Sequence, residues 1–230
     1  MAILYGDTYV DTNGVVLPSH TPTGSHAGVS WQRGPNTTGD LAIQANGVAN
    51  ANATFLDIHE LLNQSGTWPA DVSIAFDVHF FTNTNEFPAA TARHAVANDV
   101  CYGAQWGGNG GGWGLVLSNA AGNFITTIAS TAYTYPGNGV TDHMIFEVQG
   151  NALRLYKNGS LFVSGTDNTI SAAGKPGVYG SSGVVITATT GVHIENFLVS
   201  DFSASGNAPA EDDAYLPMAG IQPGPRLLIY

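Results

Sequence analysis

The residues that could do chemistry in this chain are its 17 acidic side chains, seven histidines and single cysteine. Hydrolysis of a glycosidic bond needs two carboxyl groups about 5–5.5 Å apart for retention, or about 6.5–9.5 Å apart for inversion. Alternate acidic residues on one strand would supply such a pair, because they share a face. No such run exists here, and Asp71 and Asp77 lie roughly 20 Å apart along one predicted strand. The sequence therefore predicts no catalytic residues, and only a pair assembled from different strands is left open.

The histidines and the cysteine also lack a catalytic or metal-binding spacing. No H-E-x-x-H or G-x-S-x-G pattern is present. Asp77 and His79 lie two residues apart on the polar face of a predicted strand, which favours a surface contact over a catalytic dyad. Cys101 falls in an apolar strand and is predicted to be a buried structural thiol. These patterns indicate a protein that is not an enzyme.

A run of glycines over residues 107–112 lies between Trp106 and Trp113. The run lacks a phosphate-binding pattern, because no G-K-[ST] and no helix follow it. One interpretation is a flexible hairpin loop between two strands. The other is a glycan site in which the two indoles and Asn109 contact a sugar face. Tyr133 and Tyr135, before a Pro-Gly turn, are a second pair of candidate glycan contacts.

The segment Asp11-Thr12-Asn13-Gly14 opens like an oxygen-ligand loop. Asp11 and Asn13 are therefore candidate Ca²⁺ ligands, although the terminal Glu of the full 12-residue loop is missing. The alternative is a simple Asx turn. No other cofactor is predicted.

Charged residues make up 10% of the chain, and six Lys and Arg against 17 Asp and Glu give a net charge of −11. So few basic residues exclude binding along a nucleic-acid backbone or to an anionic membrane surface. No apolar run is long enough to span a membrane. The N-terminus lacks the basic and apolar regions of a signal peptide, so synthesis without export is expected.

The pattern of apolar residues predicts an all-β protein. Strict alternation over residues 71–81 predicts one strand with a buried and a wet face. Residues 142–164 predict a three-stranded meander, in which Asn158-Gly159 is a type I′ turn. Residues 56–63 (LDIHELLN) predict a short helix. Further strands are predicted at 3–10, 29–31, 41–43, 54–56, 91–96, 100–105, 113–117, 124–129, 177–179 and 192–202.

The composition changes near residue 203. We expect a β-sandwich domain at 1–203 and a Pro-rich extended arm at 204–230. The arm ends in an apolar segment that is unusual for a solvated terminus, so it is predicted to dock on its own domain or on a neighbour. The candidate docking residues are Tyr215, Leu216, Arg226, Leu227, Leu228, Ile229 and Tyr230.

Several segments carry a family resemblance. They include "YGDTYVDTNGVVLPSHTPTGSHAGVSW", "TARHAVANDVCYGAQW", "GNALRLYKNGSLFVSGTDNTISAAGKPGVYG" and "IENFLVSDF". Over residues 3–203 the chain resembles the concanavalin A-like lectin/glucanase superfamily, in its laminin-G-like branch found in phage and bacterial surface proteins. The resemblance implies a jelly-roll sandwich of two antiparallel sheets. Its motifs are structural, so they indicate fold more than function.

These observations together favour a non-enzymatic structural or decoration protein of a tailed-phage virion. Such a protein would be made in the host cytoplasm, would lie on the virion surface, and would bind other virion proteins and further copies of itself as a homo-oligomer. The alternative is a carbohydrate-binding module that attaches to host or environmental glycans, and the two functions are compatible. A glycoside hydrolase is a third hypothesis.

Overall fold

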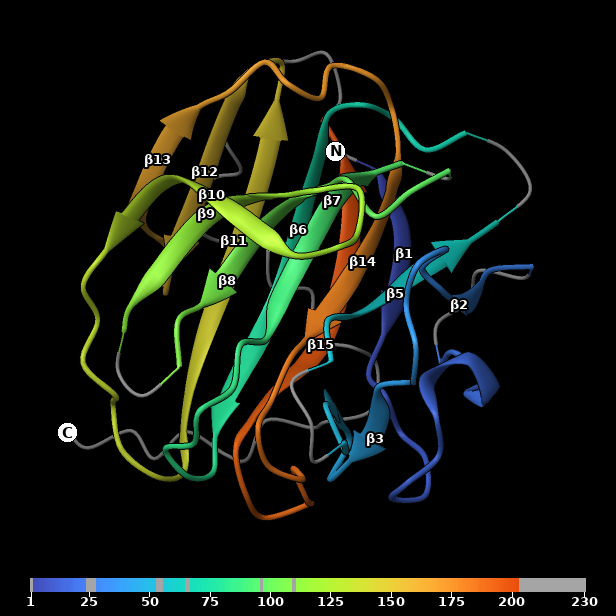
Figure 1. The fold of residues 1–230 in the computed structure, drawn as a ribbon, viewed down its shortest axis with the longest axis vertical. Helices are drawn as coiled ribbons and strands as arrows, with labels where there is room; N and C mark the ends of the chain where they lie inside the picture. The colour runs from blue at the N-terminus through green and yellow to red at the C-terminus, as the bar shows by residue number, and fades with distance from the viewer. Residues whose placement is uncertain are drawn as a thin grey trace, which may run out of the picture.

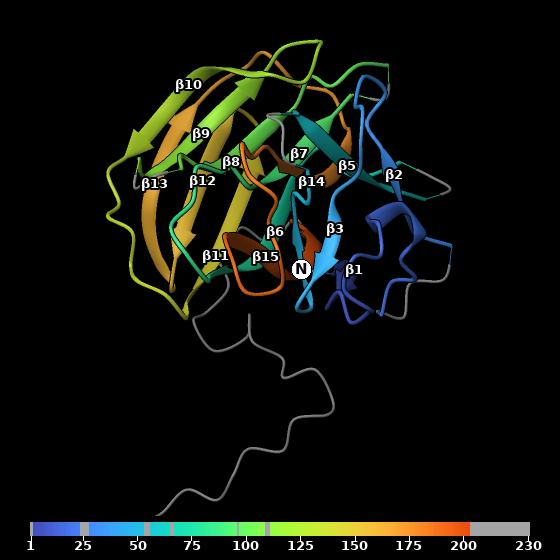
Figure 2. The same cartoon turned by 60° about the horizontal axis from the view of Figure 1, so that its bottom comes forward.

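The structure, a computed structural model, describes residues 2–23, 28–52, 56–64, 67–95, 97–108 and 111–202. These residues form two antiparallel β-sheets that pack face to face (Figures 1 and 2). A single 3₁₀ turn, Leu17–Ser19, is the one helical element among them. The predicted all-β sandwich is therefore confirmed.

The eight-stranded sheet, called sheet A, is built around the long strand β6. Strand β1 pairs with β15 at the side of this sheet. The order across the sheet is β13 (Ser160–Thr166), β12 (Ala152–Lys157), β11 (Val140–Gln149), β6 (Val72–Phe80), β15 (Val192–Asp201), β4 (Gly47–Ala49) and β3 (Ala42–Gln44), with β1 (Ile3–Asp7) paired to β15.

The seven-stranded sheet, called sheet B, covers the other side of the core. Figure 2 shows β10 and β9 above the strands β12 and β13 of sheet A. The order across sheet B is β10 (Phe124–Thr131), β9 (Trp113–Ser118), β8 (Tyr102–Trp106), β7 (Ala89–His94), β14 (Lys175–Gly180), β5 (Ile58–Asn63) and β2 (Ser30–Arg33).

Strand β6 shows how the sequence builds the sandwich. Its even-numbered side chains point into the core and are at most 1% exposed: Val72, Ile74, Phe76, Val78 and Phe80. Its odd-numbered side chains point to the opposite face, as the period of two requires. Burial of each large apolar side chain stabilises the fold by about 1.5–3 kcal/mol. The prediction for residues 71–81 is confirmed.

The predicted meander is also confirmed. Strands β11, β12 and β13 follow one another in sheet A. The turn between β12 and β13 has positive φ at Asn158 (49°) and Gly159 (82°). Both central residues of a type I′ turn need positive φ, and Asn and Gly adopt it at the lowest cost.

The helix predicted at residues 56–63 is wrong, because the segment contains strand β5. Ile58, Leu61 and Leu62 have helical spacing, which misled the prediction. Sheet B instead places β5 between β14 and β2, and the residues from Ile58 to Leu62 are all buried. Backbone pairing on both sides together with burial outweighs a weak local helix propensity.

Most other predicted strands correspond to observed ones within a few residues: β1, β2, β3, β7, β8, β9, β10, β14 and β15. The short strand β4 was not predicted. Most of the strand predicted at 54–56 lies outside the described residues, as does the whole predicted arm at 204–230. No helix in the described part of the chain is long and apolar enough to cross a membrane.

The N-terminal region is held by one buried carboxylate, Asp7, at the end of β1. Its side chain is fully buried. It accepts hydrogen bonds from the Tyr5 hydroxyl (2.8 Å), the Tyr9 backbone N–H (3.0 Å), the Trp31 indole N–H (3.1 Å) and Thr23, and it lies 3.1 Å from His20 Nε2. Burial alone would raise the pKa of Asp7, but these donors together hold it below its ordinary value.

We expect Asp7→Asn to lower the free energy of unfolding by about 3 kcal/mol, because an amide offers fewer acceptor sites to the converging donors and adds an N–H₂ of its own. The stabilisation should be present above the ordinary Asp pKa and lost on acidification, since the folded-state pKa is depressed. Urea unfolding at neutral pH measures the loss. Asp40→Asn, which alters an ion pair with the half-exposed Arg33, is the control and should cost less than about 1 kcal/mol. Equal costs for the two variants would contradict the account.

Candidate functional site

The two tryptophans predicted to stack on a sugar do not lie on the surface. Trp106 and Trp113 are 0% and 1% exposed and pair directly across the β8–β9 hairpin. Their rings pack on Phe80 and Phe76 in the core. The prediction of indole stacking is therefore wrong, because both residues occupy inward positions of their strands. The hairpin interpretation of the glycine run is confirmed, and Asn109 lies outside the described residues.

The tyrosine candidates lie at the edge of the core. The Tyr133 hydroxyl donates to Asp142 (2.6 Å), and its ring packs on Trp106. The Tyr135 hydroxyl donates to Asn138 (2.7 Å). Both side chains are only partly exposed, so glycan binding there stays a prediction.

The candidate Ca²⁺ ligands make contacts within the protein. Asp11 accepts from the Thr12 N–H and lies 3.0 Å from His20 Nδ1. Asn13 accepts from the Ala45 N–H at 2.8 Å. These contacts fit the Asx-turn interpretation, and Ca²⁺ binding at this turn stays a prediction.

The prediction of a buried thiol is confirmed. Cys101 is fully buried, and burial raises the pKa of its thiol to about 12. A thiol of that pKa is not an accessible nucleophile at neutral pH. The predicted contact between Asp77 and His79 is replaced by contacts across the sheet: Asp77 pairs with His143, and His79 contacts Thr141 at 2.8 Å.

The structure brings functional side chains together on the outer face of sheet A, which is the side away from the core. Strand β6 lies between β11 and β15, its two neighbours (Figure 1). Its odd-numbered residues face outward, and both pairings are antiparallel, so outward side chains of paired residues form transverse rows on either side of the register shift in β15. Each row crosses three or more strands.

One row carries carboxylates, and we call it the carboxylate row: His143, Asp77 and Glu195, which are direct partners across β11, β6 and β15. One oxygen of Asp77 lies 2.7 Å from His143 Nδ1. The other accepts from the Asn196 amide, also at 2.7 Å. Asn196 has a φ of 50° at the irregularity of β15, which turns its side chain toward this row. Asp77 is thus fixed in orientation by two neighbouring strands.

Glu195 faces Asp77 from the next strand. Burial raises the pKa of Glu195 to about 7, and the negative charge of Asp77 adds to the effect. Direct partners in an antiparallel pair have Cβ atoms roughly 4.5–5.5 Å apart, so the charge of Asp77 acts on Glu195 at short range. At neutral pH Asp77 therefore offers hydrogen-bond acceptors, and Glu195 is a carboxyl group that can gain or lose a proton.

The neighbouring row is apolar, and we call it the apolar row. Tyr156 and Ile145 are direct partners across β12 and β11, and Ile145 pairs with Ala75 of β6. All of its members keep some solvent exposure. The row runs across five strands through Leu161, Tyr156, Ile145, Ala75 and Leu198. Leu161 is 57% exposed, so the row reaches open solvent at its β13 end.

A second polar row lies on the other side of the apolar row. Arg154 pairs with Glu147 across β12 and β11, with 3.8 Å between the charged atoms. Arg154 also lines an open hollow of about 300 Å³ between β12 and β13, together with Ser164 and Thr166. The apolar row is thus flanked on both sides by charged and hydroxyl groups.

The alternation of apolar and polar residues predicts only part of this site. The alternation in residues 71–81 identified Asp77 and His79 as outward-facing. The partners Glu195, His143 and Tyr156 come from strands 60 or more residues away in sequence, and only the sheet order joins them. The open hypothesis of a carboxyl pair assembled from different strands describes Asp77 and Glu195.

Comparison with known proteins identifies a shared fold. No family model matches the chain, and no curated protein matches it. Among solved structures, the carbohydrate-binding module CBM66 from Bacillus subtilis aligns with a TM-score of 0.52 and 17% identity, over 73% of this chain and 92% of that one. A Bacillus subtilis protein of unknown function with a galectin-like fold aligns with a TM-score of 0.54 and 11% identity, over 87% and 96%.

A Bacillus licheniformis β-glucanase has the same fold, with a TM-score of 0.51, 9% identity, and coverage of 86% of this chain and 98% of that one. At such identities the likeness concerns the fold alone. Together with the two packed antiparallel sheets, these structures establish a jelly-roll β-sandwich.

Proposed function

We propose that this chain is a non-enzymatic carbohydrate-binding domain that holds glycans on the outer face of sheet A. The observation that carries the proposal is the apolar row, which is partly exposed along its length, reaches open solvent at Leu161, and is bordered on each side by polar side chains. The CBM66 module and the galectin-like protein support it only through their shared fold.

The arrangement suits the chemistry of a sugar ring. One face of a pyranose presents C–H groups, which bury well against an aromatic or aliphatic surface such as Tyr156 and Ile145. The hydroxyl groups project from the ring edge and need oriented donors and acceptors. On one side of the row, each oxygen of Asp77 has a second lone pair that can accept from a sugar hydroxyl, beyond the one engaged by His143 or Asn196. On the other side, Arg154 supplies donors.

The Asp77–Glu195 pair favours a glycoside hydrolase as the second candidate. Two neighbouring carboxyl groups, one of them with a raised pKa like that of Glu195, resemble a general acid and its partner. Binding is the better-supported function, because both oxygens of Asp77 are already engaged by His143 and Asn196. Cleavage of a bound glycan by the wild type, abolished in Glu195→Gln, would establish the hydrolase instead.

The laminin-G-like branch, the location on a virion and the docking arm are also proposals. A laminin-G-like domain on the surface of a phage virion is supported by the low charge and the Gly- and Asn-rich composition. A carbohydrate-binding face is compatible with that location. The proposed docking arm lies outside the described residues.

We expect Tyr156→Ala to weaken glycan binding by roughly 5- to 30-fold, because loss of one stacked ring costs about 1–2 kcal/mol. Tyr156→Phe keeps the ring and should retain most of the affinity. Screening on a glycan array identifies the ligand, and isothermal titration of the wild type and both variants measures the change.

Tyr135→Ala is the matched control for this experiment. It removes a partly exposed tyrosine that the sequence predicts to contact a glycan but that lies outside the apolar row. It should leave the affinity unchanged. A loss of binding in Tyr135→Ala but not in Tyr156→Ala would place the site elsewhere. Far-UV circular dichroism on each variant confirms that the sheets are intact.

The raised pKa of Glu195 predicts a pH-dependent stability. Between pH 4.5 and about 7 the folded state retains a proton that the unfolded state has released, so stability falls as the pH rises. Glu195→Gln lacks this titration. Relative to the variant, the wild type should lose about 2 kcal/mol of unfolding free energy across that window. Urea unfolding of both proteins at each end of the window measures it, and a constant difference would contradict the assigned pKa.

A further inference from the structure

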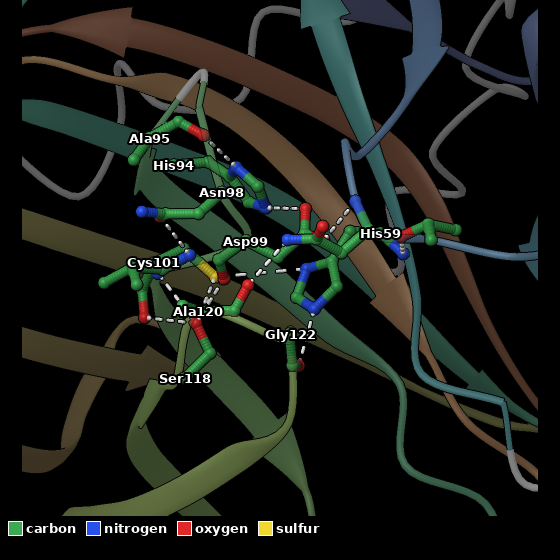
Figure 3. A network of polar contacts seen from close by, with 12 residues as sticks. His59, His94, Ala95, Asn98, Asp99, Cys101, Ser118, Ala120 and Gly122 are labelled. Atoms are coloured by element: carbon green, nitrogen blue, oxygen red, sulfur yellow. Dashed lines mark hydrogen bonds and ion pairs between the residues drawn. The ribbon is translucent and has the colours of Figure 1, made fainter.

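A buried cluster on the outer face of sheet B is distinct from the proposed glycan site. It comprises His59 of β5, His94 at the end of β7, Asp99, and Cys101 just before β8 (Figure 3). All four are 0% exposed. One ligand-type atom each from His59, His94 and Cys101 lies within 4.8 Å of the others. The loop that contains Gly122 and the segment at Asn36 contact the cluster from the solvent side.

Both histidines have one ring nitrogen fixed by a backbone carbonyl. His59 Nε2 lies 2.8 Å from the Gly122 carbonyl oxygen, and His94 Nδ1 lies 3.1 Å from that of Ala95. A carbonyl oxygen only accepts, so these nitrogens carry the protons. In the neutral tautomers, His59 Nδ1 and His94 Nε2 are left with free lone pairs, and both are directed into the cluster (Figure 3).

The inward atoms do not satisfy one another. His94 Nε2 and Asp99 Oδ1 lie 3.2 Å apart, yet each is buried without a hydrogen bond. Two acceptors at that separation repel unless a proton or a cation lies between them. His59 Nδ1 lies 4.0 Å from Cys101 Sγ, which is longer than an ordinary hydrogen bond to a nitrogen.

These atoms match the donor set of a tetrahedral zinc ion. With Zn–N of about 2.0–2.1 Å and Zn–S of about 2.3 Å, neighbouring ligand atoms lie roughly 3.3–3.6 Å apart. The observed 3.2 Å and 4.0 Å are within about half an ångström of these values. The ligand atoms of His59, His94 and Cys101 lie within 4.8 Å of one another, so some of them draw together by up to roughly 1 Å when the ion binds. Two imidazoles, one thiolate and one carboxylate around Zn²⁺ also have no net charge, which suits a site removed from water.

The surroundings orient each ligand. The second oxygen of Asp99 accepts from the Asn36 N–H at 2.8 Å, and the Cys101 N–H donates to Ser118 Oγ at 2.7 Å. Hydrogen bonds of this kind, which orient the ligand side chains and the backbone that carries them, are characteristic of metal sites.

We propose that His59 Nδ1, His94 Nε2, Cys101 Sγ and Asp99 Oδ1 bind one Zn²⁺ ion as a structural site. Binding releases the thiol proton of Cys101 to solvent and forms the Zn–S bond, with no change in oxidation state. The ion ties strands β5 and β7 to the segment before β8, and its burial means that it enters as the chain folds.

The direct test uses the full-length chain without a histidine tag, refolded in Zn²⁺ and dialysed. Elemental analysis should find about one zinc per chain, as a closed four-ligand site requires. Cys101→Ser and His94→Gln should each hold at least about tenfold less zinc. His193→Gln is the matched control, because both ring nitrogens of that buried histidine lie within 3.0 Å of backbone carbonyl oxygens. It should retain the metal.

Refolding the wild type in Co²⁺ gives a readout that needs no variant. Cys101 is the only cysteine, so a thiolate-to-cobalt charge-transfer band, with visible bands of tetrahedral cobalt, would assign the metal to this cluster. A folded wild type with neither bound zinc nor the cobalt band would overturn the proposal. The cluster would then be metal-free, with His94 and Asp99 in direct contact at 3.2 Å.

Discussion

The register of strand β6 is the constraint on which the rest of the structure depends. It lies between β11 and β15 in sheet A and pairs with both along almost its whole length. Its inward residues, from Val72 to Phe80, fill the centre of the sandwich, and its outward residues form the middle of the carboxylate and apolar rows. A slip of one residue would place Asp77 in the core and expose Phe76. The burial of apolar side chains therefore fixes the outer face as firmly as it fixes the core.

The two sheets use their outer faces differently. Sheet A leaves its carboxylate row and apolar row partly open to solvent, with charged groups on either side of the apolar row. Sheet B covers part of its outer face with loops, so that His59, His94, Asp99 and Cys101 are buried together. The first arrangement suits recognition of a ligand from solution, and the second suits a permanent structural connection. A metal at the second site would stabilise sheet B without contacting the glycan face.

Much of the fold follows from local sequence patterns. The alternation in β6 and the Asn158-Gly159 turn depend on neighbouring residues alone, so they were predictable. The segment 56–63 was mispredicted because its apolar spacing fits either a helix or a strand buried on both faces. Trp106 and Trp113 were misplaced because a loop between two aromatics does not reveal which way the rings point. The rows on sheet A and the buried cluster join residues from distant strands. Local sequence patterns do not predict which strands become neighbours, so these groups could not be predicted.

The central claim is that glycans bind across the apolar row of sheet A. The most direct measurement is an NMR titration of the isotopically labelled chain with a glycan that it binds, followed through assigned backbone and side-chain signals. The account predicts that the largest shift changes occur at Tyr156, Ile145, Ala75 and the Asn196 amide, with little change near Tyr135 or Cys101. Changes confined to the loops at Tyr133 and Tyr135, or to sheet B, would contradict it.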